Sequence, residues 1–168
     1  MALKTKLKIP DLWFDVYARL LPGTAFVAAI RVLLLGNVEV PNGKELFVLA
    51  FAGYLFALIT QPISSRLARL VWYLADKVTS EEVGYVDKVK QKLGRSTRES
   101  LILSKMHGEV TFFCQLSVLS VVYQVIQLTY RSTQQPWNPC CIVITFVFVA
   151  FAFEVATRCV DKAKKYDS

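Results

Sequence analysis

A stripe of polar side chains runs through one of the most apolar parts of this chain. Ser117, Ser120, Gln124, Gln127 and Arg131 follow one another at spacings of 3, 4, 3 and 4 residues, which places them on a single face of an α-helix. Such a stripe fits the lining of an aqueous path for ions. It fits as well a set of hydrogen bonds to neighbouring helices within a bundle. The spacing alone leaves both interpretations open.

The same helix face turns apolar toward the N-terminus, where Phe113, Val110 and Met106 continue the stripe. A helix face that is polar at one end and apolar at the other suits a pore closed by a hydrophobic constriction, which excludes water until it widens. Under the pore interpretation, these three residues are the predicted gate.

The elements that must position these residues are four apolar segments, at 20–35, 47–63, 110–128 and 140–155. A hydrophobic content of 54% and a mean hydropathy of +0.41 exceed the usual values of soluble domains. Each segment approaches the ~20 residues that a helix needs to cross a bilayer. We therefore predict an all-α protein of one domain, residues 1–168, with membrane spans at about 18–36, 46–63, 109–129 and 140–157.

The basic residues predict how these spans are oriented. Of 20 Lys and Arg, 17 lie before the first segment, between the second and third, or after the last, whereas the two other connections hold one each. Cytoplasmic loops retain Lys and Arg because positive segments resist translocation. Both termini and the connection 64–108 are therefore predicted to be cytoplasmic.

Two ionisable side chains, Arg31 and Glu154, fall inside apolar segments. Such residues are functional candidates by default, because lipid solvates charges poorly. The alternatives are a salt bridge of Glu154 with Arg158 or Arg19, and an Arg31 side chain that reaches the outer membrane surface. We expect no direct bridge between Arg31 and Glu154, because they lie at different depths.

The connection 64–108 is predicted to form a small cytoplasmic helical cap. A helix continues from the second span, a short helix covers about 80–93, and a third begins near Thr97 and runs into the third span. The first of these is predicted to be amphipathic, with one apolar face made by Ile63, Leu67, Leu70, Val71, Leu74 and Val78. In the second span, small residues at 50, 53, 57, 60 and 64 form another face, which suits close helix packing.

A basic cluster marks the middle of this cap, where Lys88, Lys92 and Arg95 share one helix face. The cluster suits a phosphate-rich cytoplasmic ligand. It suits equally the anionic lipid headgroups of the membrane, at ~1 kcal/mol per basic residue. Nothing in the sequence predicts readout of duplex DNA.

Acid–base chemistry has weak support. His107 and Glu109 stand close together where the cap enters the third span. No nucleophile motif, phosphate-cradling loop or metal-ligand spacing accompanies them. We therefore predict that the protein is not an enzyme and uses no metal ion or cofactor.

Several short motifs resemble a class of small four-span bacterial membrane proteins. They are Asp15-x-x-x-Arg19-x-x-Pro22-Gly23, Gly53-Tyr54, and His107-x-Glu109-x-x-Phe112-Phe113. Some members of that class are membrane effectors of anti-phage systems, such as those of the Hailong type. The resemblance implies a homo-oligomeric channel in the bacterial inner membrane. It also implies that an oligonucleotide signal from a partner nucleotidyltransferase controls the channel, which depolarises the infected cell.

The residues and the resemblance together predict an oligomeric ion channel, which we take as a tetramer surrounded by membrane lipid. Four short spans leave too little interior for a path through one copy, so the pore is expected between copies, with the third span facing its axis. The alternative is a structural or assembly protein without a pore, which binds anionic lipid or a protein partner.

Overall fold

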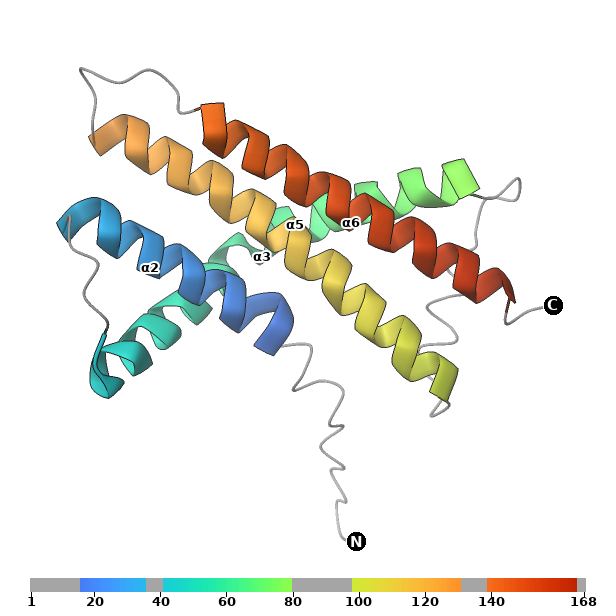
Figure 1. Ribbon diagram of the computed structural model, residues 1–168, viewed down its shortest axis with the longest axis horizontal. Coiled ribbons are helices and arrows are strands. Elements are labelled where there is room, and N and C mark those ends of the chain that lie inside the picture. Colours follow the sequence, from blue (N-terminus) through green and yellow to red (C-terminus); the bar gives the residue numbers. More distant parts are fainter. Residues whose placement is uncertain (1–15, 36–40, 80–97, 131–138, 166–168) are drawn as a thin grey trace, which may run out of the picture.

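The computed structural model describes residues 16–35, 41–79, 98–130 and 139–165, and this part of the chain is helical (Figure 1). A π-helical turn, η1 (Val16–Leu20), leads into α2 (Leu21–Leu35). The longer helices are α3 (Gly43–Thr79), α5 (Arg98–Tyr130) and α6 (Pro139–Lys165). The predicted all-α class is confirmed for these residues, whereas the predicted short helix near 80–93 lies outside them.

Three of the helices are long and apolar enough to cross a membrane. They are α3, the part of α5 at Lys105–Thr129 and the part of α6 at Pro139–Ala163. Charged residues are absent from α3 between Leu46 and Ser65, which explains a continuous apolar stretch there. The helix α2 has 15 residues and is about 22 Å long, so it is shorter than the ~30 Å hydrocarbon core. The first predicted span, 18–36, therefore depends on η1 as well, and the four-span topology stays a prediction.

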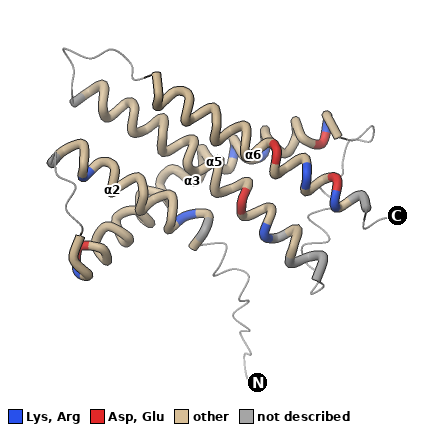
Figure 2. Tube along the Cα trace, viewed as in Figure 1, with Lys and Arg blue, Asp and Glu red and all other residues tan. Residues whose placement is uncertain are grey.

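The helix α5 is central in the arrangement. It lies beside α6, and α3 crosses behind both of them (Figure 1). Among the described elements, α5 contacts η1, α2, α3 and α6, whereas the backbones of α2 and α6 do not come together. Figure 2 shows that the charged residues of α5 and α6 lie in one half of each helix, whereas the other half is uncharged.

The predicted helical continuity on either side of residues 80–97 is confirmed. Helix α3 runs without a break past Pro62 to Thr79, and α5 begins at Arg98. The C-terminal part of α3 and the N-terminal part of α5 pack with the C-terminal part of α6. Their shared core includes Ala68, Trp72, Leu103, Met106, Val110, Ala156 and Val160.

The apolar face predicted for the C-terminal part of α3 packs only in part. Ile63, Leu70, Leu74 and Val78 are exposed, with 42–72% of their surface accessible. Val71 is the buried member of that face and Leu67 packs partly against the core, whereas the other buried residues there are Ala68, Trp72, Ala75 and Asp76. The small-residue face of the second span continues inward, and small side chains allow α5 and α6 to approach closely. The larger side chains of Ile63, Leu70, Leu74 and Val78 consequently lie on the exposed side of the helix.

The helices α2 and α3 cross at two glycines. A Cβ atom built on Gly23 would lie 2.0 Å from the carbonyl oxygen of Gly53, and one on Gly53 would lie 2.4 Å from the carbonyl carbon of Gly23. No side chain fits between the two backbones. On the same face of α3, Ala57, Thr60 and Ser64 are buried, which confirms that the small residues serve helix packing.

Candidate functional site

Two residues of the polar stripe of α5, Ser120 and Gln124, contact α6 within the chain. Gln124 Nε2 donates to Thr145 Oγ1 at 3.2 Å, and the Thr145 hydroxyl lies 3.0 Å from Ser120 Oγ. Thr145 also lies 2.9 Å from the carbonyl oxygen of Cys141, one turn earlier in α6. Neutral polar groups thus satisfy one another between the two helices, as the hydrogen-bonding interpretation of the stripe requires.

The two other stripe residues that the structure describes, Ser117 and Gln127, are placed differently from Ser120 and Gln124. Ser117 is 2% exposed and donates to the carbonyl oxygen of Phe113 at 2.8 Å. Gln127 is half-buried, and Arg131 lies outside the described residues. Their pore-lining role stays a prediction, and it would require this face of α5 to turn away from α6.

The predicted gate residues also pack inside the subunit. Met106 and Val110 are 8% and 0% exposed and belong to the core shared by α3, α5 and α6. The ring of Phe113 stacks on Phe151, with ring centroids 5.6 Å apart, and on Phe148 at 6.5 Å. In this arrangement the three residues attach α5 to its neighbours, so the gating role is a prediction about another state.

Arg31 forms a salt bridge with Glu45 at the beginning of α3. Its Nη2 lies 3.3 Å from Glu45 Oε2, and its side chain is 24% exposed. Glu45 also accepts a hydrogen bond from the backbone nitrogen of Asn42, while Asn42 Oδ1 accepts one from the nitrogen of Glu45 at 2.9 Å. This reciprocal capping explains why α3 begins here. The sequence analysis missed the Glu45 partner, although the Asn42-x-x-Glu45 spacing indicates the cap.

Glu154 forms an ion pair with Arg158, one turn later on α6. This result confirms one of the two salt bridges proposed from the sequence. Both side chains are exposed, Glu154 by 52% and Arg158 by 68%. Glu154 therefore points away from its own subunit, whereas the neutral polar residues of α5 point into it.

Gln115 is a buried polar residue that the sequence analysis missed. It is 1% exposed, and its Nε2 donates to the carbonyl oxygen of Ala57 at 3.1 Å and to Thr60 Oγ1 at 2.6 Å. The contact joins the middle of α5 to α3. A glutamine within the apolar run 110–128 indicates a buried hydrogen bond. Gln115 does not lie on the helix face of Ser117, Ser120 and Gln124, so the spacing of the stripe does not include it.

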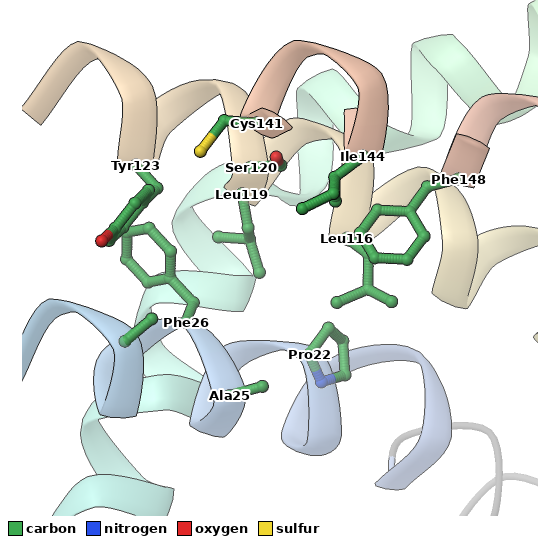
Figure 3. A pocket seen from close by; sticks show the side chains of 11 residues that line it. Pro22, Ala25, Phe26, Leu116, Leu119, Ser120, Tyr123, Cys141, Ile144 and Phe148 are labelled. Atoms are coloured by element: carbon green, nitrogen blue, oxygen red, sulfur yellow. The ribbon is translucent and has the colours of Figure 1, made fainter. Parts of the chain in front are cut away.

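A groove of about 300 Å³ opens between α2 and α6, with α5 as its floor (Figure 3). It exists because α2 and α6 both lean on α5 without meeting each other. Pro22, Phe26, Leu119, Ile144 and Phe148 give it a mainly apolar lining. Its chemistry suits hydrocarbon chains better than ions.

His107 and Glu109 have separate neighbours. The imidazole of His107 stacks on the indole of Trp72 with centroids 5.6 Å apart, and Glu109 lies 3.9 Å from Lys105 Nζ. Among the described residues, no group of three or more His, Cys, Asp or Glu side chains is arranged to hold a metal ion. The basic cluster Lys88, Lys92 and Arg95 lies outside the described part of the chain.

The comparisons with known proteins found no relative. The chain matches no protein-family model, no curated protein and no solved structure.

Proposed function

We propose that this membrane protein assembles into a homo-oligomeric ion channel. The observation that supports it most is the Glu154–Arg158 pair, which lies in a candidate span and is exposed on the outside of the subunit. An ionised side chain within a membrane helix is costly, and such residues usually face water or protein. A water-filled path between copies supplies that environment.

Control by a cytoplasmic ligand is the second part of the proposal. The segment 80–97, which carries Lys88, Lys92 and Arg95, joins α3 to α5, and both helices continue from it into candidate spans. A ligand that binds this segment better in one state can thus shift the position of α5. An anionic oligonucleotide suits the charge of the cluster. The anti-phage role and the bacterial inner membrane rest on the resemblance of the sequence motifs.

The channel is tested by measuring ion flux from purified protein in liposomes. Phe113→Ala removes the ring stacked on Phe148 and Phe151, and we expect the loosened contact between α5 and α6 to raise the basal flux. Tyr123→Phe is the matched control, because it alters another aromatic residue of α5 without removing its ring. Absence of flux from the native protein and from Phe113→Ala would refute the channel.

The ligand is tested with short single-stranded oligonucleotides and detergent-purified protein across a salt series. Specific binding should distinguish base compositions and weaken when Lys88, Lys92 and Arg95 are replaced by Gln. Binding that is equal for every polyanion and disappears at moderate salt would identify the cluster as a lipid-binding or topology signal instead.

A structural or assembly protein without a pore is the second candidate. The contacts of Ser120 and Gln124 with Thr145 favour it, because they satisfy these two residues of the polar stripe within one copy of the chain. In that case the liposomes stay silent and Phe113→Ala is harmless to cells.

A further inference from the structure

The central position of α5 leaves it little surface for a pore between copies. Four other elements contact it, and from Val110 to Thr129 its exposed positions are Val121, Val125 and Thr129. These three residues follow one another every fourth position and are mostly apolar. A pore between copies must be lined by surfaces that the subunit leaves free, and α5 offers a narrow one.

The helix α6 has a broad free face with Glu154 near its centre. Val147 and Ala150 lie seven and four residues before Glu154, Arg158 lies four residues after it, and all four are exposed. On the opposite side, Ala152, Ala156 and Cys159 are buried against the core. Among the exposed acidic residues that the structure describes in the candidate spans, Glu154 lies farthest from the end of its span.

The depth and direction of Glu154 keep its carboxylate in the membrane. Glu154 lies 15 residues after Pro139, which is about 22 Å along the helix, whereas Arg158 is about 28 Å along it, near the far side of a ~30 Å core. Side chains of a helix lean toward its N-terminus. Under the predicted topology, this lean draws Arg158 toward Glu154 and not Glu154 toward the cytoplasm.

We infer that α6, not α5, lines the pore, and that Glu154 from each copy forms an acidic ring that favours cations. The inference rests on the proposed function and specifies its ion path. Rings of Asp or Glu select cations because the carboxylates attract them and repel anions. Arg158, one turn farther inward, partly offsets this charge, so the two residues act on selectivity in opposite directions.

Selectivity is tested in planar bilayers under a KCl gradient. Glu154→Gln keeps the size of the side chain and removes its charge, so the reversal potential should move toward zero as the K⁺/Cl⁻ permeability ratio falls severalfold. Arg158→Gln should move it the opposite way. Gln127→Glu places a carboxylate on the half-buried stripe of α5 and should change the ratio less than Glu154→Gln does.

The lining helix is tested by cysteine accessibility in a background without the four native cysteines. Ala150→Cys faces outward from α6, and a water-soluble cationic thiol reagent should block its current. Ser117→Cys, buried on the stripe of α5, is the matched control and should stay unmodified.

The outcomes separate the two levels of the proposal. Current that is blocked through Ala150→Cys and altered by Glu154→Gln supports α6 as the lining. The inference is overturned if the thiol reagent blocks the current of Ser117→Cys alone, or if neither Ala150→Cys nor Glu154→Gln changes the current. The channel would then be lined by other residues. Absence of current from the native protein refutes the proposed function, and the inference with it.

Discussion

Replacing Gly53 with alanine tests whether the crossing of α2 and α3 holds the fold together. The new Cβ would lie 2.4 Å from the carbonyl carbon of Gly23 and 2.4 Å from the nitrogen of Thr24. Carbon atoms pack best at about 3.5–4.0 Å, so the helices must separate by about 1 Å or more. Both obstructing atoms belong to the backbone and cannot rotate away, as the end of a side chain would.

The size of the effect follows from two opposing terms. Inserting one methyl group into a tightly packed site costs about 1–3 kcal/mol, and the short backbone distances place Gly53→Ala near the upper end. Alanine returns up to ~1 kcal/mol because it favours the helix more than glycine does. The free energy of unfolding should therefore fall by about 2 kcal/mol, a roughly 30-fold change in the unfolding equilibrium.

The measurement is equilibrium unfolding of the detergent-solubilised protein during a titration with dodecyl sulfate, followed by helicity. Gly43→Ala is the matched control, because a Cβ there meets nothing within 4 Å and should leave the stability unchanged or slightly raised. Gly23→Ala approaches the same crossing from the other helix and should resemble Gly53→Ala. Unfolding of Gly53→Ala at the same detergent fraction as Gly43→Ala would refute the close crossing.

Three further predictions concern the polar contacts and the topology. Gln115→Met fills a similar volume without the hydrogen bonds to α3 and should lower the free energy of unfolding by about 0.6–1.7 kcal/mol; native stability would show that the bonds contribute nothing. Glu45→Gln can keep the helix cap but removes the charge opposite Arg31, so the free energy of unfolding should fall by at most ~1 kcal/mol and this decrease should vanish as salt rises. A decrease that does not depend on salt would assign the effect to the helix cap. In intact cells, a membrane-impermeant thiol reagent should label cysteine at Gln134 and not at Lys90; labelling at Lys90 would overturn the predicted orientation.

The sequence was sufficient to predict the helices and their approximate limits. Long runs without charge indicated the spans, and the helical spacing of Gly53, Ala57, Thr60 and Ser64 indicated a packed face, which the structure confirms. Glu154 and Arg158, four residues apart, also indicated their own pairing. These features are local, so spacing along one helix determines them.

The faces that helices turn toward one another were harder to predict. Hydrophobicity separates inside from outside in a soluble domain, but lipid accepts large apolar side chains as readily as a core does. In the apolar run 47–63, Phe47 and Ile59 are exposed, while the smaller Gly53 and Ala57 are buried. Thr145 shows the same limit, because the partner that α6 provides for Ser120 and Gln124 depends on how α5 and α6 pack.

The contacts between α5 and α6 also set the energy that a gating ligand has to supply. If α5 turns its polar stripe away from α6, the two hydrogen bonds to Thr145 and the stacking of Phe113 on Phe148 and Phe151 are lost. At about 0.6 kcal/mol for each membrane hydrogen bond and about 0.5–1.5 kcal/mol for each ring contact, the turn costs about 2–4 kcal/mol. A ligand that opens the channel by this route must bind the turned state roughly 30- to 1000-fold more tightly than the packed one. If α6 lines the pore instead, the contact between α5 and α6 can stay intact during gating. A smaller difference in the ligand's affinity for the open and closed states is then sufficient.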